Sequence, residues 1–573
     1  MLKNILTKRS SLRPLRKTLA SFALKYFAIM IILISCKESP KQEVIKINPS
    51  METPFIWEGA NLYFLLTDRF NNGDVSNDIN YDRTKETGKL RGFEGGDIKG
   101  IIQKIDEGYF TGLGINAIWF TPIFEQVHGS VDEGTGNTYG YHGYWIKDWT
   151  NLDANFGTKE DLRELVEKAH QNGIRIVMDA VINHTGPVTD KDPVWAEDWV
   201  RTGPQCNYKT FETTTACTLV KNLPDVLTES NENVELPEFL VKKWKEEGRY
   251  EQEIAELDAF FKRTGYPRAP RFYIIKWLTD YILEFGVDAY RADTVKHTEE
   301  SVWEEFKNEC DFAFAEWKKN NPEKVLDEND FFLFAEVYNY NISNAKAFDF
   351  GDKKVNYFDY GFDAMINFEF KSNANDDYED IFSRYSSILN SDLKGNTVIN
   401  YVSSHDDGGP FDRERKRSIE SANKLILSPG ISQVYYGDES ARSLIIEGTV
   451  GDATLRSNMN WEEINTDAET QKILKHWQKL GQFRNNHPAI GAGIHTMISK
   501  TPYIFSRILQ KNDFEDAVII GLDLPLGKKE IEVSNIFKNG DILRDHYSGN
   551  EIEVKNDKIV LTTDFEVVLL ELK

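Results

Sequence analysis

Cysteine and net positive charge are both scarce in this 573-residue chain. Its four cysteines are too few for a disulfide-scaffolded fold, which depends on a dense set of bridges. The 68 lysines and arginines are outnumbered by 92 aspartates and glutamates, which gives a formal net charge of −24. This acidity excludes nucleic acid and other polyanions as partners, because such ligands require basic surfaces.

The chain also lacks an apolar run long enough to span a bilayer securely. The run "FALKYFAIMIILIS" (22–35) follows a basic start and is shorter than the ~20 residues of a spanning helix, as is typical of a secretory signal. "LISC" (33–36) resembles a bacterial lipobox, in which Cys36 would be lipidated and become the mature N-terminus. A plain signal or signal-anchor with an incidental cysteine is the alternative. We expect a signal peptide over 1–35, a tether over 36–54, and an exported protein lipid-anchored to a bacterial membrane, periplasmic or at the cell surface.

The remaining cysteines predict one disulfide. Cys206 and Cys217 are eleven residues apart in a loop-like region, and an exported protein can oxidise them. Cys310 lies on an amphipathic stretch, where we expect a buried packing residue.

Short apolar runs alternate with helical segments after residue 55, which predicts parallel strands covered by helices. The seven strand candidates are 61–68, 115–122, 174–184, 287–293, 331–337, 396–406 and 431–439, with an eighth within 357–370. Eight such units close into a (β/α)8 TIM barrel of roughly 250 residues or more. We expect this α/β catalytic barrel over 55–184 and 266–497.

Two segments depart from this alternation. The long polar stretch after the third strand predicts an inserted subdomain over 185–265. From 498 to 573, short alternating runs such as "AVIIGLDL" predict a small antiparallel β-domain.

Charged and polar side chains stand where the predicted strands end. They are Asp179, Asn183 and His184 after the third strand, Arg291 and Asp293 after the fourth, Glu336 after the fifth, and His405 and Asp406 after the seventh. One such residue is most often structural, but the carboxyl ends of all barrel strands surround a single mouth. Gathered carboxylates raise one another's pKa, so that one stays protonated beside an ionised neighbour. Glycosidic cleavage needs such a pair, a carboxylate that attacks the sugar and an acid that protonates the leaving oxygen.

Four segments in this order carry a family resemblance: "DAVINH" (179–184), "GVDAYRADTVKH" (286–297), "FAEV" (334–337) and "YVSSHD" (401–406). They resemble the four motif regions of the α-amylase family, glycoside hydrolase family thirteen. "LPDV" (223–226) resembles the family's fifth region, in the inserted subdomain. The resemblance covers about residues 55–500 and implies a (β/α)8 barrel, an inserted domain after strand three and a C-terminal antiparallel β-sandwich.

The resemblance also implies residue roles. Asp293 resembles the nucleophile, Glu336 the general acid/base and Asp406 the residue that stabilises the transition state. Tyr144, His184, Arg291 and His405 resemble the residues that hold the sugar at the cleavage point, Lys296 and His297 resemble next-subsite contacts, and Trp145 offers a ring for stacking. Ala289 and Ala335 stand where many members have glycine, and neither is a catalytic position.

Two groups of oxygen donors predict calcium. The resemblance implies that Asn183, Asp225 and the His297 carbonyl surround one ion between the barrel and the inserted domain. A second candidate set resembles the N-terminal calcium site of several members: Asn72, Asp74, Asn77, Asp78, the Gly95 carbonyl and Asp97. The alternatives are an Asx-turn loop for 68–78 and a loop turn for Asp225. We therefore expect one or two calcium ions.

Three functions remain open on the sequence. The first is a retaining glycoside hydrolase, which we expect to be a monomer, that cleaves α-1,4-glucosidic bonds in starch, maltodextrins or related α-glucans. The second is a cyclodextrin-forming or maltosyl-transferring enzyme; one C-terminal β-domain favours hydrolysis, and Thr294 favours α-1,4 over α-1,6 links. The third is an inactive surface lipoprotein that binds glycans, which the complete carboxylate trio disfavours.

The expected partner is thus an α-glucan polysaccharide or oligosaccharide, bound by a single copy of the chain.

Overall fold

The computed structural model describes residues 53–573, which belong to one compact unit. The predicted signal peptide (1–35), Cys36 and nearly all of the predicted tether lie outside the described residues. No helix within 53–573 is long and apolar enough to cross a membrane.

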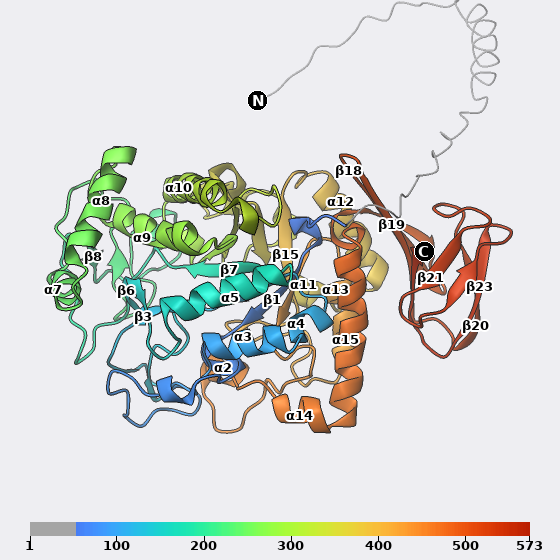
Figure 1. The fold of residues 1–573 in the computed structure, drawn as a ribbon, viewed down its shortest axis with the longest axis horizontal. Helices are drawn as coiled ribbons and strands as arrows, with labels where there is room; N and C mark the ends of the chain where they lie inside the picture. The colour runs from blue at the N-terminus through green and yellow to red at the C-terminus, as the bar shows by residue number, and fades with distance from the viewer. Residues whose placement is uncertain (1–52) are drawn as a thin grey trace, which may run out of the picture. The chain divides into compact units, whose positions relative to one another are not determined.

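Eight parallel strands close into a barrel, around which the other elements are arranged (Figure 1). The strands are β1 (Asn61–Leu65), β2 (Ala117–Phe120), β7 (Arg175–Ala180), β10 (Ala289–Ala292), β11 (Phe332–Ala335), β14 (Ala364–Asn367), β15 (Thr397–Tyr401) and β16 (Ile431–Tyr435). They follow one another around the barrel in chain order, and β16 pairs with β1 to close it. Every strand residue is buried, which explains why the strands appear in the sequence as apolar runs. The predicted (β/α)8 barrel is confirmed, with β14 as the strand within 357–370.

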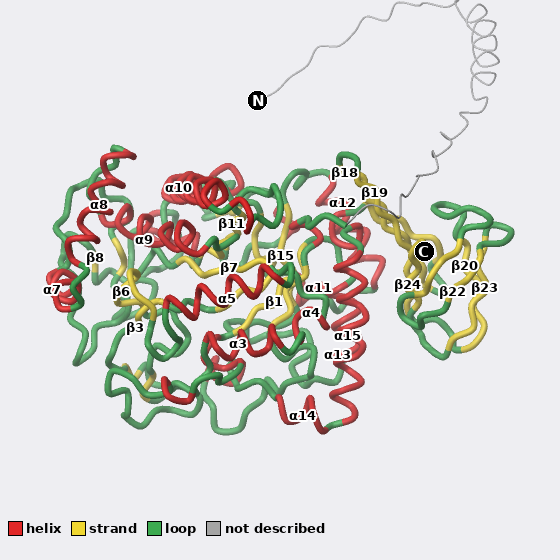
Figure 2. Tube along the Cα trace, in the orientation of Figure 1, coloured by secondary structure: helices red, strands yellow, loops and turns green. Residues whose placement is uncertain are grey.

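Helices cover the outside of the barrel (Figures 1 and 2). They are α2 (Thr67–Phe70), α3 (Ile98–Asp106), α4 (Tyr109–Gly112), α5 (Lys159–Gln171), α9 (Pro270–Phe285), α10 (Glu300–Asn320), α11 (Phe370–Asn373), α12 (Tyr378–Asn390), α13 (Ser418–Ile426), α14 (Trp461–Thr466), α15 (Ala468–Asn486) and α16 (Ala489–Ala492). The sequence of helix α5 explains where the helix begins and which of its faces is buried. Thr158 caps its first turn in a capping box with Asp161, and Leu162, Leu165 and Val166 form the buried stripe.

The inserted subdomain follows β7, as predicted. It contains β8 (Val200–Arg201), α6 (Glu212–Thr215), β9 (Asp225–Val226), α7 (Glu238–Glu246) and α8 (Tyr250–Thr264). A disulfide joins Cys206 and Cys217, whose Cα atoms are 5.0 Å apart, while Cys310 is buried with a free thiol. Short strands also occur between β2 and α5, namely β3 (Phe124–Gln126), β4 (Val131–Asp132), β5 (Asn137–Thr138) and β6 (Ile146–Leu152). A further hairpin, β12 (Phe348–Asp349) with β13 (Lys354–Val355), follows β11.

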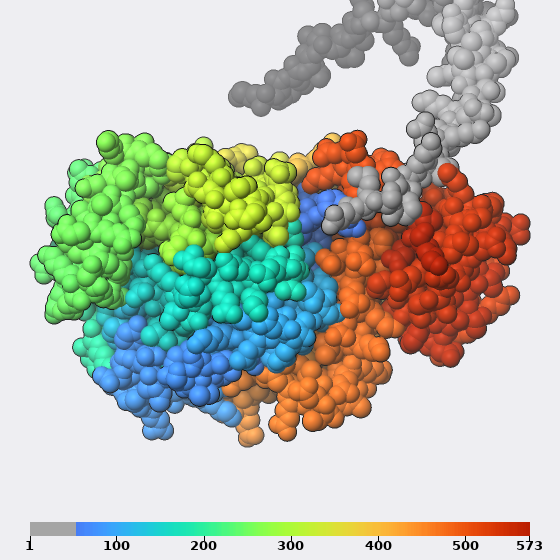
Figure 3. Space-filling view, viewed as in Figure 1, coloured from blue at the N-terminus to red at the C-terminus, as the bar shows by residue number. Residues whose placement is uncertain are grey.

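The C-terminal strands form a separate antiparallel β-domain with its own hydrophobic core. Its strands are β17 (Ile494–Ser499), β18 (Tyr503–Lys511), β19 (Phe514–Leu522), β20 (Gly527–Glu532), β21 (Ile542–Asp545), β22 (Glu551–Glu553), β23 (Lys558–Thr563) and β24 (Val568–Leu572). Six of these strands make one sheet, and β20 and β23 pair as a second. The space-filling view shows these residues gathered in a lobe beside the residues of α15 (Figure 3). The predicted C-terminal β-domain is confirmed.

Candidate active site

The carboxyl ends of adjacent barrel strands bring the predicted catalytic side chains together. β10 lies between β7 and β11, and its register places Arg291 beside Asp179 of β7. Beyond the strand ends, the Asp293 amide donates to the last carbonyl of β7 at 2.9 Å, and the Glu336 amide to the last carbonyl of β10 at 3.0 Å. Backbone pairing therefore fixes the positions from which these side chains project.

Arg291 is the centre of the cluster, and it is 1% exposed. Its guanidinium contacts Asp293 Oδ1 at 2.6 Å, Asp179 Oδ1 at 2.8 Å and Glu336 Oε2 at 3.0 Å. One buried cation thus contacts three carboxyl groups. Because a single positive charge cannot balance three buried carboxylates, this arrangement favours a protonated form of some of them.

Glu336 retains its proton to a higher pH than Asp179 does. Burial raises the pKa of Glu336 to about 8, with Arg291 acting in the opposite direction and Asp293 and Asp406 adding to the rise. Burial likewise raises the pKa of Asp179 to about 7 against the effect of Arg291. The Thr294 amide donates to Glu336 Oε2 at 2.9 Å, which fixes the orientation of that carboxyl group.

Asp406 has different surroundings. Although partial desolvation in the mouth opposes ionisation, His405 and Arg456 hold the pKa of Asp406 well below its usual range. His405 Nε2 lies 3.0 Å from Asp406 Oδ2, and Arg456 contacts Oδ1 of the same carboxylate. The Asp406 side chain is 44% exposed, so this anion faces the open mouth of the barrel.

The side chains predicted to hold a sugar at the cleavage point surround this cluster. Tyr144 donates to Asp179 Oδ2 at 2.9 Å, and its ring lies nearly parallel to that of His405, with centroids 5.6 Å apart. His184 Nε2 is 3.1 Å from the Tyr144 carbonyl, and its buried Nδ1 has no partner among the described residues. Trp145 is 7% exposed and packs with Leu223, so most of its ring is unavailable for stacking.

Lys296 and His297 lie just beyond Asp293 in the chain. Lys296 Nζ donates to the Tyr338 carbonyl at 3.2 Å, beside Glu336 in the chain. His297 is buried, and its Nδ1 is 3.0 Å from the Thr214 carbonyl of the inserted subdomain. Lys296 therefore reaches the surface of the mouth, whereas the His297 ring is held within its wall.

Several residues of the site escape sequence reasoning. Arg456 lies in an irregular segment after β16, where it contacts both Asp406 and Asp452. Trp119 of β2 donates its indole N–H to Asp179 Oδ2 at 3.1 Å. Asp179 stands at a predicted strand end, but the sequence predicts no role for it. The strand position of Trp119 was a usable signal, since it ends a barrel strand, whereas nothing in the local sequence marks Arg456.

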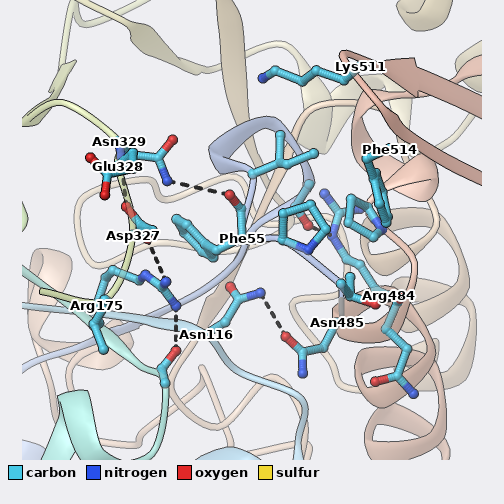
Figure 4. Close-up of a pocket in the computed structure, with 18 of the residues that line it drawn as sticks. Phe55, Asn116, Arg175, Asp327, Glu328, Asn329, Arg484, Asn485, Lys511 and Phe514 are labelled. Carbon is cyan, nitrogen blue, oxygen red and sulfur yellow. Dashed lines mark hydrogen bonds and ion pairs between the residues drawn. The ribbon is translucent and has the colours of Figure 1, made fainter. Parts of the chain in front are cut away.

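A cavity of about 340 Å³ opens beside Asp293 and Asp406. Its other polar walls include Tyr144, His184 and Arg456. A larger cavity, of about 1020 Å³, lies at the amino-terminal face of the barrel strands, around the start of β7. There Arg175 and Asp327 point toward each other, as do Asn116 and Asn485 (Figure 4). None of the predicted catalytic side chains lines this larger cavity.

The candidate calcium ligands of the first loop converge on one another. Asn72 Nδ2 donates to Asp78 Oδ1 at 2.8 Å, and Asn77 Nδ2 lies 3.3 Å from Asp97 Oδ2. A methyl group at Gly95 would lie 2.4 Å from Asn72 Nδ2 and 2.8 Å from Asp78 Oδ1. Asn77 Oδ1 is buried without a hydrogen-bond partner among the described residues. Asp74 is ion-paired with Lys99 at 2.6 Å, so this carboxylate already has a cation.

The second candidate set is partly satisfied by protein. Asp225 is 1% exposed, and Arg201 Nε lies 2.8 Å from its Oδ2 as an ion pair. Asp225 Oδ1 and Asn183 Nδ2 are buried without hydrogen-bond partners in residues 53–573. Within the same residues, no cluster of three or more His, Cys, Asp or Glu side chains suits a metal ion. Each candidate site therefore combines carboxylate oxygens with amide and carbonyl oxygens.

Comparison with known proteins settles the family. The model of the α-amylase catalytic domain matches residues 64–449. A periplasmic α-amylase of Escherichia coli (strain K12) is 36% identical over 516 residues, which cover 79% of this chain and 71% of the relative. This chain belongs to the α-amylase family. The predicted family and the glycosidase class of enzyme are thereby confirmed.

Other members of the α-amylase family are more distant. A cyclomaltodextrin glucanotransferase of Thermoanaerobacterium thermosulfurigenes is 26% identical, over 87% of this chain and 64% of its own length. The crystal structure of an Anoxybacillus α-amylase superposes with a TM-score of 0.62 at 24% identity, covering 91% of this chain and 99% of that one. That likeness concerns the fold alone. Hydrolases and transferases therefore both occur among the relatives.

Proposed function

We propose that the protein is a retaining glycoside hydrolase that cleaves α-1,4-glucosidic bonds in starch, maltodextrins or related α-glucans. The observation that carries the proposal is the cluster in which Arg291 contacts Asp293 and Glu336 while burial keeps the latter protonated. A guanidinium at 2.6 Å stabilises a carboxylate anion at Asp293, as a nucleophile requires. The raised pKa of Glu336 suits an acid that must donate a proton near neutral pH.

The reaction then proceeds in two steps. Glu336 protonates the glycosidic oxygen while an oxygen of Asp293 attacks the anomeric carbon, which forms a glycosyl-enzyme and releases the leaving sugar. Glu336, now ionised, removes a proton from water, and this water displaces Asp293 from the anomeric carbon. Two inversions give overall retention of configuration, for which the two carboxyl groups stand about 5–5.5 Å apart.

Asp406 stabilises the transition state in this proposal. Its anion is held by His405 and Arg456 and faces the mouth, where it accepts hydrogen bonds from sugar hydroxyls. Such bonds strengthen as positive charge develops on the distorted ring, so they favour the transition state over bound substrate. Tyr144, with its ring against His405, provides an aromatic wall for the same sugar.

Calcium has a structural role in this proposal. The first loop fits the ion, because Asn77 Oδ1 is a buried oxygen without a hydrogen-bond partner among residues 53–573, Asn77 Nδ2 contacts Asp97, and Asn72 contacts Asp78. When bound, calcium supplies positive charge that holds oxygen ligands of distant segments together. Asn183, Asp225 and the His297 carbonyl would hold a second ion, for which Asp225 Oδ1, without a hydrogen-bond partner in the described part of the chain, is the available carboxyl oxygen. Arg201 already neutralises part of that site, so we expect the first loop to bind calcium more tightly.

We further propose that the chain is exported and anchored by lipid at Cys36. The lipobox-like "LISC" and the basic, apolar N-terminal segment support this proposal, and the E. coli relative is named as periplasmic. Mass spectrometry of the N-terminal peptide tests it. A diacylglyceryl-modified Cys36 is expected, and a mature chain that starts elsewhere contradicts the anchor.

A glucan transferase is the second candidate, favoured by the similarity to cyclomaltodextrin glucanotransferase. Product analysis on maltoheptaose, pullulan and starch separates the two. Hydrolysis predicts stoichiometric new reducing ends and short maltooligosaccharides. Cyclodextrins, or products longer than the substrate, would identify a transferase, and the absence of any product would leave the inactive glycan-binding protein.

A further inference from the structure

A third cavity, of about 980 Å³, lies where helices on the outside of the barrel meet the C-terminal β-domain. The first turns of α12 and α13 line it, together with residues 500–503 at the beginning of β18. None of the predicted catalytic side chains is among its lining residues. Since ligand sites occur preferentially at junctions between domains, the chemistry of these walls indicates what the cavity could bind.

Two tyrosines, one from each side of the junction, line this cavity. Tyr378 belongs to α12 and Tyr503 to β18, and the side chains of both are partly exposed. Their rings are nearly parallel, with an interplanar angle of 15° and centroids 5.7 Å apart. A tyrosine ring is a flat apolar surface against which the C–H groups of a sugar ring can pack. The two rings together offer such a surface in one place.

The two tyrosine rings rest on a buried aromatic layer. The centroid of the Tyr378 ring lies 5.9 Å from that of Phe382, and the centroid of the Tyr503 ring lies 5.4 Å from that of Phe505. Phe382 and Phe505 are fully buried and contact each other. The Tyr503 hydroxyl also donates to Glu379 Oε2 at 2.9 Å. The rings are therefore held in place before a ligand arrives, which lowers the entropic cost of binding.

Polar groups of both signs accompany the rings. Asp380 and Asp523 line the cavity and are exposed, as are Lys416 and Lys500. Carboxylates accept hydrogen bonds from hydroxyl groups, and ammonium groups donate hydrogen bonds to them. Because acidic and basic side chains occur together, the walls favour a neutral ligand with many hydroxyl groups over a strongly charged ligand. An apolar face edged by hydroxyl groups is the chemistry of an uncharged sugar.

We propose that this cavity is a second carbohydrate-binding site, at which a segment of an α-glucan chain packs on the rings of Tyr378 and Tyr503. The choice of an α-glucan rests on the proposed function, whereas the binding of a neutral sugar chain rests on the cavity itself. A polymer held at the cavity and at the mouth binds more tightly than one held at the mouth alone, because the second contact is intramolecular. A tetrasaccharide is too short to gain this advantage.

Adsorption to insoluble starch granules in the cold measures binding at the cavity. Tyr378→Ala and Tyr503→Ala should each weaken adsorption of the full chain about tenfold and raise KM on soluble starch, because each variant removes an aromatic face. Both should retain kcat/KM on maltotetraose within twofold. Phe565→Ala is the matched control and should adsorb as the wild type does. Phe565 is 42% exposed and lies 4.7 Å from Lys479 Nζ in the C-terminal domain, outside this cavity.

Hydrogen–deuterium exchange of the wild-type chain decides the matter if the alanine variants fold poorly. Saturating β-cyclodextrin, a cyclic α-glucan, should slow exchange in the peptides that contain Tyr378 and Tyr503, but not in the peptide that contains Phe565. Unchanged exchange in the two tyrosine peptides, or wild-type adsorption in both alanine variants, would overturn the inference. A chain that adsorbs to starch through these tyrosines but cleaves no α-glucan would instead refute the proposed function and support the second site.

Discussion

The two ends of the barrel hold similar polar side chains but differ in how their charges are balanced. At the carboxyl ends of the strands, three carboxyl groups share Arg291, and the pKa of Glu336 rises to about 8. At the amino-terminal face, Arg175 pairs with Asp327 at 2.6 Å and donates to the Gly173 carbonyl at 2.7 Å. The larger cavity is at this second face (Figure 4). Competing buried charges, rather than cavity size, therefore indicate where the chemistry occurs.

The largest expected effect is the loss of catalysis at the mouth. Asp293→Asn and Glu336→Gln should each lower kcat on starch by about a thousandfold or more, because each removes a reacting group. Arg175→Gln at the opposite face is the matched control and should retain kcat within twofold. Starch cleavage near the wild-type rate in either carboxylate variant would refute the assigned roles.

The contacts of Asp406 give the next test. Arg456→Met removes a cation that holds this carboxylate ionised, and it should lower kcat about ten- to a hundredfold. Arg456→Lys keeps the charge and should recover part of the loss. If the two variants were equally active, the charge of Arg456 would have no part in catalysis.

The pH dependence of activity and stability should reflect Glu336 at the carboxyl ends of the barrel strands. Since Glu336 must be protonated to act as the acid, kcat/KM on maltoheptaose should fall as the pH rises through about 8. The native state also binds this proton more tightly than the unfolded chain does. Its contribution to stability is therefore present at low pH and is lost between about 4.5 and 8, and Glu336→Gln should flatten that part of the Tm profile. A kcat/KM that does not change up to pH 10 would contradict the raised pKa of Glu336.

Removal of calcium should affect stability more than chemistry. EDTA is expected to lower Tm by several degrees and added calcium to restore it, because a ligand that binds only the native state stabilises it. Asp97→Ala should abolish most of this response, whereas Asp327→Asn at the amino-terminal face should retain it. Metal analysis that finds no calcium, with a Tm unaffected by EDTA, would contradict both candidate sites.

The smallest effect concerns the ion pair of the larger cavity. Arg175 of the Arg175–Asp327 pair is buried and Asp327 is partly exposed, so loss of this charged hydrogen bond in Arg175→Gln should lower the free energy of unfolding by about 1–2 kcal/mol. Urea denaturation measures this change. A loss of several kcal/mol, or a loss of activity, would mean that this face contributes more than packing.

The sequence allowed the barrel and the carboxylate positions to be predicted for a physical reason. Parallel strands buried on both faces must be apolar, and their carboxyl ends must converge, so Asp293, Glu336 and Asp406 could be assigned to one mouth. Arg456 could not be assigned, because an irregular segment after β16 brings it to Asp406 through a long-range contact. Helices α7 and α8 of the inserted subdomain could not be predicted either, because their sequence is mainly polar.

Trapping of the glycosyl-enzyme tests the central claim most directly. Glu336→Gln lacks the base for the second step, yet α-maltosyl fluoride needs no acid for the first, so the covalent intermediate should accumulate. Mass spectrometry of the digested protein should find the added maltosyl mass on the peptide that contains Asp293. A label on Asp406, or inversion of configuration in the wild-type product, would contradict the account.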